Sequence, residues 1–174
     1  MTIFDSYRNR YESSREEVIS LDDYLALCKT DSMAYAGAAE RLLAAIGEPE
    51  VVNTHDDPRL SRIFQNKVIR RYPAFAEFYG MEESIEHLVS YLKHAAQGLE
   101  ERKQILYLLG PVGGGKSSLA EKLKELMEQV PFYAIKGSPV FESPLGLFSP
   151  EEDGAILEED YGIPRRHLRG IMSP

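Results

Sequence analysis

The stretch "ILYLLGPVGGGKSS", residues 105–118, is the strongest indication of how this chain folds. It begins with five apolar residues, a composition typical of a short strand that is buried on both faces of a parallel sheet. A glycine-rich turn follows, and leucines at helical spacing come after the turn. A second apolar run at residues 132–135 completes the predicted order of strand, loop, helix and strand, which is one βαβ unit.

The glycine-rich turn matches the phosphate-binding pattern G-x-x-x-x-G-K-[ST]. Its glycines can adopt positive φ angles and place no side chain before an approaching oxygen, so backbone N–H groups can point inward. The helix behind the turn adds unsatisfied N–H groups and the positive end of its dipole. The pattern predicts that Lys116 contacts the β- and γ-phosphates of a nucleotide and that the Ser117 hydroxyl ligates Mg2+. The predicted binding residues of the turn are Gly110, Pro111, Val112, Gly113, Gly114, Gly115, Lys116, Ser117 and Ser118.

Other motifs of ATP-handling enzymes are weaker. Residues 132–136 resemble the protein-kinase strand that carries an ATP-binding lysine, but no H-R-D or D-F-G occurs in the chain. The acidic run at residues 158–160 follows only three apolar residues, so a capped helix is preferred there to a Walker B strand. The glycine turn could itself be a plain turn with an exposed lysine, but its place between a predicted strand and helix favours phosphate binding.

The composition narrows the class of protein. The chain has 174 residues, of which 43% are hydrophobic and 28% charged, as is ordinary for a globular protein. Its one cysteine cannot form a disulfide within the chain, and no apolar window resembles a membrane span or a signal peptide. A net charge of -8 disfavours nucleic acid as a partner, and the basic residues 165–169 are interpreted as a solvated turn or helix face. We therefore expect a cytoplasmic protein with neither a membrane nor a nucleic-acid partner.

The first part of the chain is predicted to be helical. Ser20 and Asp23 have the spacing of a capping box, which starts a short helix. An alanine- and leucine-rich helix is expected to follow and to end at Gly47 and Pro49. Residues 48–60 contain several turn-forming residues and are predicted to be a connector.

Three further elements are expected around the glycine turn. Residues 67–72 are a candidate short strand. Residues 85–96 have apolar positions on one side of an amphipathic helix, and Gly98 is its natural end. A last helix is predicted to be capped by Ser149 and to end at residues 162–164.

Several longer stretches resemble the PrkA family of bacterial proteins, usually called serine protein kinases, which carry an AAA+-type ATPase domain. They are "EFYGMEESIEHLVSYLKHAAQGLEERKQILYLLGPVGGGKSSLAEKLK", "DDPRLSRIF", "KGSPVFESPLGLF" and "EEDYGIPRRHLRGIMSP". The resemblance covers most of the chain, from about Tyr11 to the last residue. It implies that residues 110–118 are the Walker A loop of the family.

The resemblance also points to residues 78–81, the segment before the amphipathic helix. It is similar to the linker that lines the adenine pocket of AAA+ proteins, which implies that Tyr79 and Gly80 contact the nucleotide. An aromatic ring and Met81 beside a glycine could flank a flat base. A second interpretation stays open, in which the aromatic residues of this region, Phe75, Phe78 and Tyr79, only pack the helix onto the sheet.

The expected fold class is α/β, namely a P-loop NTPase core of AAA+ type that is incomplete in this chain. Residues 1–60 are predicted to be an α-helical N-terminal segment, and residues 61–174 the N-terminal part of the ATPase domain. Members of the family are several times longer. The resemblance therefore implies that the Walker B acid, the sensors, the arginine finger and a kinase-like region lie beyond Pro174. The chain by itself is expected to be inactive.

The resemblance implies that the full-length protein binds ATP and Mg2+, and acts as an ATPase or transfers phosphate to serines of protein substrates. It also implies a role in bacterial stress or stationary-phase regulation, and it suggests a homo-oligomer. Two other classes stay open. One is a nucleotide-gated regulatory or assembly module without catalytic turnover, and the other is a helical interaction domain that ignores nucleotide. No catalytic residue is assigned.

Overall fold

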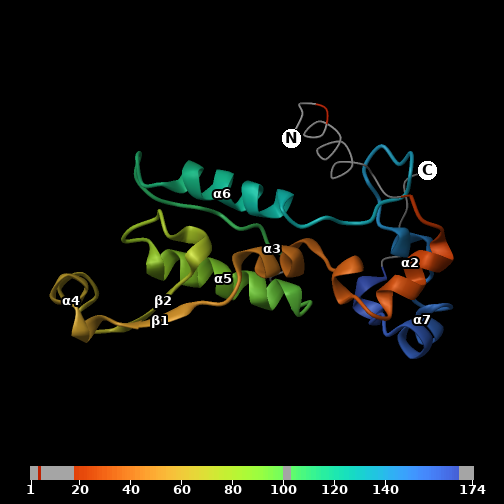
Figure 1. Cartoon of the computed structure of the whole chain (residues 1–174), viewed down its shortest axis with the longest axis horizontal. Coiled ribbons are helices and arrows are strands. Elements are labelled where there is room, and N and C mark those ends of the chain that lie inside the picture. Colours follow the sequence, from red (N-terminus) through yellow and green to blue (C-terminus); the bar gives the residue numbers. More distant parts are fainter. Residues whose placement is uncertain (1–3, 5–17, 100–102, 169–174) are drawn as a thin grey trace.

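The computed structural model describes residue 4 and residues 18–99 and 103–168 of the chain. Its helices and strands are α2 (Leu21–Cys28), α3 (Ala38–Ile46), β1 (Glu50–Asn53), α4 (Pro58–Phe64), β2 (Val68–Arg71), α5 (Glu82–Ala96), α6 (Lys116–Glu128) and α7 (Gly154–Tyr161). Short 3-10 turns lie at Ser32–Ala34, Thr54–Asp56, Pro73–Phe75, Pro144–Leu147 and Arg165–His167. The molecule is elongated, with α3, α5 and α6 in the middle, α4 at one end and α7 at the other (Figure 1).

The two strands form an antiparallel hairpin, in which Val52 lies opposite Ile69. The candidate strand at residues 67–72 is thus confirmed as β2, but the prediction of a plain connector at residues 48–60 is wrong. The turn-forming residues there are caps inside a compact arm: the Asp57 carboxylate accepts a hydrogen bond from the N–H of Arg59, at 2.8 Å, and so starts α4.

Local signals predicted most of the helix ends, but the predicted cap of the last helix at Ser149 is wrong, because α7 begins at Gly154 with Asp153 as its cap residue. The Ser20 hydroxyl accepts a hydrogen bond from the N–H of Asp23, and the Asp23 carboxylate accepts one from the same hydroxyl at 2.6 Å, so this cap of α2 is confirmed. Gly47 ends α3 with φ +75° and Gly162 ends α7 with φ +68°. The amphipathic helix is also confirmed as α5. None of the described helices combines the length and apolar character that a membrane crossing requires.

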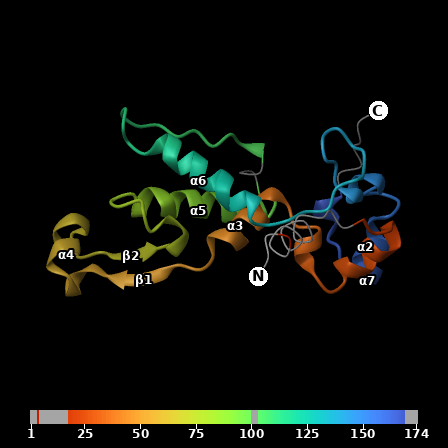
Figure 2. The same cartoon turned by 45° about the horizontal axis from the view of Figure 1, so that its top comes forward.

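A central core holds the middle of the molecule together. It joins the inner faces of α3, α5 and α6, and α3 contacts both of the other two helices (Figures 1 and 2). Its buried residues are Leu42, Ile46, Tyr72, Phe75, Ile85, Leu88, Val89, Leu92, Leu119 and Leu126. Because α5 and α6 share this core, the segments that precede these two helices are brought to the same end of the pair (Figure 2).

A second core lies at the end of the molecule that carries α2 and α7 (Figure 1). It contains Tyr24, Leu25, Cys28, Ala34, Leu145, Leu157, Ile163 and Leu168. Glu40 of α3 links this second core to the central core. Its carboxylate lies 3.5 Å from both the Arg166 guanidinium and His167 Nε2. Part of the basic stretch at residues 165–169 therefore contacts an acidic side chain of the same chain; Arg169 lies outside the described residues.

The two strands predicted around the glycine turn are absent from the structure, so the prediction of a βαβ unit is wrong for the described residues. Residues 105–109 run extended without a paired strand. Leu108 packs against the central core, whereas Ile105 is 91% and Leu109 84% exposed. A strand of this composition needs neighbours on both edges and both faces, and the sheet of the described residues contains only β1 and β2.

Residues 132–135 differ from the prediction for another reason. They pass from the central core to the second one, where the ring of Tyr133 lies 5.5 Å from that of Tyr24. Arg41 of α3 holds the start of this passage, since its guanidinium donates to the carbonyl of Val130 at 2.7 Å and lies over the ring of Phe132. Burial lowers the pKa of Arg41. The predicted division of the chain at residue 60 stays a prediction, and both cores combine residues from its two sides.

The second core makes stability depend on pH. Burial raises the pKa of the Tyr24 hydroxyl above its ordinary 10.0 and that of the Cys28 thiol above its ordinary 9.0. The folded chain therefore holds these protons more tightly than the unfolded chain, and their stabilisation is complete below about pH 9. We expect the free energy of unfolding, measured in urea, to fall by more than about 1 kcal/mol between about pH 8 and about pH 11.

The matched variant for this prediction combines Tyr24→Phe and Cys28→Ala. It should flatten most of the alkaline decline, because neither replacement side chain titrates. The part that remains is assigned to Tyr35 and Tyr72, whose pKa values burial also raises. An alkaline decline of unchanged steepness in the double variant would contradict the assignment to Tyr24 and Cys28.

Candidate functional site

The glycine turn has the backbone that its sequence requires. Gly113 and Gly115 lie in the left-handed region, at φ +78° and +74°, where a side chain strains the backbone. Between them, the N–H of Gly114 donates to the carbonyl of Pro111 at 3.2 Å, which closes the turn. A Cβ on Gly114 would lie 3.1 Å from that same carbonyl oxygen. Each of the three glycines thus meets a geometric need, and the turn is tight as a result.

Helix α6 begins directly after the turn and is open at its N-terminus. Gly115 is its cap residue, and the Gly115 carbonyl accepts the first helical hydrogen bond from Leu119, at 2.8 Å. No side chain of the described residues caps this end. The N–H groups of the first turn and the positive end of the helix dipole therefore remain available to an anion.

Lys116 folds back over the turn. Its amine donates to the carbonyl of Gly110 at 2.9 Å and to that of Pro111 at 2.5 Å, and the side chain is half-buried. The charge is therefore held beside the open helix end by the backbone of the turn itself. This position differs from that of a lysine that extends freely into solvent.

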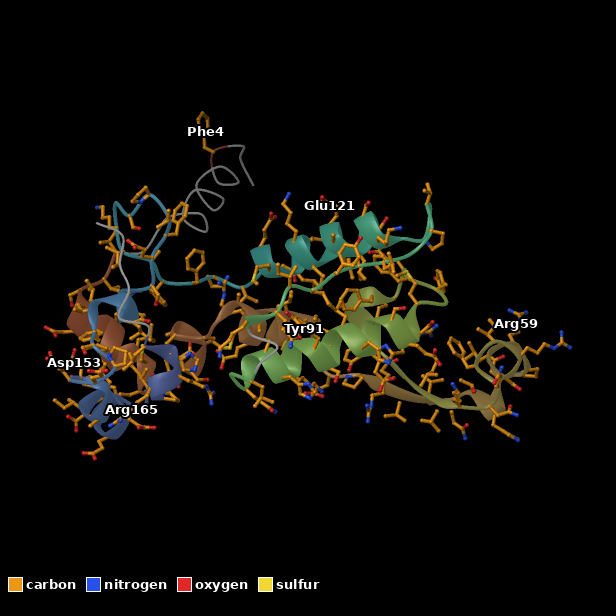
Figure 3. The ribbon with its side chains drawn as sticks, turned by 180° about the vertical axis from the view of Figure 1, so that it is seen from behind. Phe4, Arg59, Tyr91, Glu121, Asp153 and Arg165 are labelled. Atoms are coloured by element: carbon orange, nitrogen blue, oxygen red, sulfur yellow. The ribbon has the colours of Figure 1, made fainter. Side chains whose placement is uncertain are left out.

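Ser117 and Ser118 are exposed at the start of α6, where they line an open hollow of about 740 Å³. Its other lining residues are Glu77, Phe78, Glu121, Lys122 and Glu125. The amine of Lys122 lies 3.0 Å from Glu125 and 3.6 Å from Glu77, and its hydrogen bond to Glu125 raises the pKa of Lys122. Glu121 projects from the outer side of α6 (Figure 3) and lies 3.9 Å from Lys124.

The charge of this hollow limits what it can hold. Its rim carries more acidic than basic side chains, so it repels a free anion that extends beyond the turn. A phosphate chain there needs a cation to offset the repulsion. In the described residues, no three His, Cys, Asp or Glu side chains are grouped as a metal site.

The segment before α5 lies beside the turn, although more than thirty residues separate the two in the sequence. A Cβ on Gly115 would lie 3.0 Å from Met81 Sδ and 3.7 Å from Met81 Cε, so the thioether fills the space next to this glycine. The sequence placed Met81 in the linker but gave no sign that it contacts the turn. The one relevant signal in the sequence was the position of Met81 directly before a predicted helix.

The aromatic residues of this segment fall into two groups. Phe75 is 3% exposed and its ring meets that of the half-buried Phe78 edge-on, with 6.0 Å between the ring centres. Both pack on the central core, as the packing interpretation requires. Tyr79, in contrast, is 80% exposed, and Gly80 turns the chain behind it with φ +76°. Of these three aromatic residues, Tyr79 is the one whose ring is exposed.

The acidic run at residues 158–160 lies on α7, at the far end of the molecule from the turn (Figure 1). Glu158 is 3.7 Å from Arg165. The structure therefore brings Met81 to the glycine turn and leaves this acidic run remote from it (Figure 1).

Comparison with known proteins places these features in a family. The family model described as the PrkA AAA domain matches residues 19–174. The whole chain is 64% identical to a protein named serine/threonine kinase YeaG from Escherichia coli (strain K12), of which it covers 28%. Over 87% of its length it is 37% identical to a protein named ATP-dependent protease PrkA from Bacillus subtilis (strain 168), of which it covers 23%. No solved structure matches the chain.

Proposed function

We propose, for a chain that belongs to the PrkA AAA domain family, that the turn at residues 110–118 binds the phosphates of ATP. The observation that carries this proposal is the open N-terminus of α6 with the amine of Lys116 held beside it. A backbone of N–H groups and one fixed positive charge is a suitable receptor for a triphosphate. Tyr79 and Gly80 are proposed to contact the adenine base.

Magnesium is proposed as the partner of the bound nucleotide. The Ser117 hydroxyl is exposed at the mouth of the hollow, and the acidic rim favours a ligand whose charge a cation has reduced. Bound there, Mg2+ would offset the charge of the phosphates. The residues of this chain would contribute one hydroxyl ligand and the surrounding negative potential.

The fold around the turn is proposed to be a P-loop core of AAA+ type. Residues 105–109 have the composition of a central strand, and Leu108 already faces the central core. The exposed side chains of this run would be covered when strands from a longer protein pair with it. Residues 61–174 would then belong to one ATPase domain, with residues 1–60 as a helical segment before it.

The activity of the whole protein is proposed to be ATP hydrolysis linked to phosphate transfer to serines of protein substrates. One relative is named a kinase and the other an ATP-dependent protease. Proteins of both kinds use a nucleotide, so both names are consistent with a nucleotide site. We further propose that the protein acts in the cytoplasm as a homo-oligomer, in bacterial stress or stationary-phase regulation.

A second candidate is a nucleotide-gated assembly module without turnover. It is favoured by the acidic side chains beside Ser117, because Glu77, Glu121 and Glu125 each lie within ion-pair distance of a lysine. A carboxylate that is paired in this way is poorly placed to accept a proton from an attacking water. In this second candidate, the chain would hold a nucleotide but would not hydrolyse it.

The proposed function is tested by titration of the 174-residue chain with a fluorescent ATP analogue, with and without Mg2+. We expect Mg2+ to tighten binding of the wild type, and Ser117→Ala to keep the Mg2+-free affinity while losing about tenfold in the presence of Mg2+. Ser90→Ala, an exposed serine on α5, is the control that should change neither value. A folded wild type that binds no nucleotide would overturn the proposal. Release of phosphate during the titration would separate an enzyme from the module without turnover.

A further inference from the structure

We propose that Met81 is a positioning residue for the phosphate-binding turn. Its side chain holds the backbone of Gly115, and with it the N-terminus of α6, in the shape that receives a triphosphate. The proposal rests on the nucleotide site described above and gives Met81 a role different from that of a base-lining residue.

The first support is the contact itself. The thioether of Met81 fills the place of a side chain at Gly115, with Sδ only 3.0 Å from where a Cβ would stand. Gly115 is the cap residue of α6 and has a left-handed backbone at φ +74°. Among the neighbours of this glycine, the atoms of Met81 are the ones within reach of that position. The sulfur therefore occupies the space on this side of Gly115 and limits how far the backbone can move toward α5.

The second support is that Met81 is itself fixed. It is the cap residue of α5, and its carbonyl accepts the first hydrogen bond of that helix from Ile85, at 2.9 Å. Its side chain also packs against the central core that α5 and α6 share. A thioether suits this place, since methionine is unbranched and fills irregular gaps. The contact thus joins the N-termini of α5 and α6, two helices that share the central core.

This arrangement predicts what the loss of the side chain does. Met81→Ala leaves a gap beside Gly115, and a glycine at a helix cap has many backbone conformations open to it. The N–H groups that follow Gly115 then spend less time in the orientation that converges on a phosphate. The effect should reach any ligand that uses the turn, whether or not the ligand carries a base.

A role in the base pocket predicts a different pattern. If Met81 only flanked the adenine ring, its loss would weaken ATP but leave inorganic tripolyphosphate unaffected, because that ion has no base. The comparison of these two ligands therefore distinguishes positioning of the turn from contact with the base. A general loss of structure would also weaken both ligands, so a separate measurement of folding distinguishes it from positioning.

The experiment measures the affinity of the 174-residue chain for ATP and for tripolyphosphate, both with Mg2+, by calorimetry. We expect Met81→Ala to weaken both ligands by the same factor of about ten, and Met81→Leu, of similar volume, to stay within about threefold of the wild type. Met127→Ala is the matched control, because Met127 also packs on the central core but lies near the far end of α6. It should leave both affinities unchanged. Circular dichroism confirms that each variant is folded at the temperature used.

Each other outcome has a clear consequence. If Met81→Ala weakens ATP alone, the residue lines the base pocket and the positioning role is overturned. If neither ligand is weakened in a folded variant, the contact with Gly115 has no functional role. A folded wild type that binds neither ligand overturns the nucleotide site itself, which is a different result from a wild type that binds both.

Discussion

Replacing Lys116 with alanine is expected to weaken binding of Mg-ATP by about 100-fold or more. A charged hydrogen bond contributes about 1.5–3 kcal/mol, and the lysine can reach oxygens of more than one phosphate. A loss of about 3 kcal/mol corresponds to about a 100-fold change in the dissociation constant. No other cation in the described residues is held over the turn in the same way, so nothing replaces the missing charge.

The structure also predicts that this variant remains folded. In the ligand-free chain the amine of Lys116 contacts the carbonyls of Gly110 and Pro111, both of which are exposed. Water can take over these two acceptors when the side chain is removed, so the cost to stability is small. We expect the free energy of unfolding to change by less than about 1 kcal/mol. Loss of binding would then report on the site and not on the fold.

Lys124→Ala is the control for this variant. Lys124 lies on the same helix and is exposed, with its amine 3.9 Å from Glu121. Its removal changes the net charge of the chain by the same amount but leaves the turn intact, and ATP affinity should stay within about twofold of the wild type. Equal losses for Lys116→Ala and Lys124→Ala would show that only the overall charge matters. An unchanged affinity for Lys116→Ala would place the nucleotide elsewhere or nowhere.

The parts of the fold that the sequence predicted are those governed by neighbouring residues. The cap formed by Ser20 and Asp23 and the stop at Gly47 depend on contacts within one turn of helix, so the local pattern was sufficient. The phosphate-binding pattern likewise includes its own geometry, because the positive φ angles fall on Gly113 and Gly115.

The errors arose where structure depends on distant residues. The composition of residues 105–109 indicates a strand that has partners on both sides, but composition does not say where those partners lie. The arm at residues 48–60 was missed because Asp57 and its neighbours serve equally well as loop residues and as caps. The contact of Met81 with Gly115 could not be predicted, since it requires α5 and α6 to share one core.

Phe75→Ala is expected to give the largest loss of stability among the variants considered, about 3–5 kcal/mol. Phe75 is 3% exposed and lies in the central core, with its ring edge-on to Phe78. The truncation removes apolar contacts and leaves a cavity that the helices cannot easily close. Because a whole domain is stable by only about 5–15 kcal/mol, urea unfolding should show a large shift of the midpoint. A change below about 1 kcal/mol would mean that the ring is not packed as described.

Tyr79→Ala is the counterpart that separates the two interpretations of this segment. Tyr79 is 80% exposed, so its removal should change stability by less than about 0.5 kcal/mol. If its ring stacks on the adenine base, the variant should lose affinity for ATP but not for tripolyphosphate, whereas an effect on the turn would weaken both ligands. Phe75 would then stabilise the fold and Tyr79 would bind the ligand, although only three residues lie between them. If Tyr79→Ala binds ATP with the affinity of the wild type, Tyr79 does not contact the base. This segment would then contribute only to binding of the phosphates, through the turn.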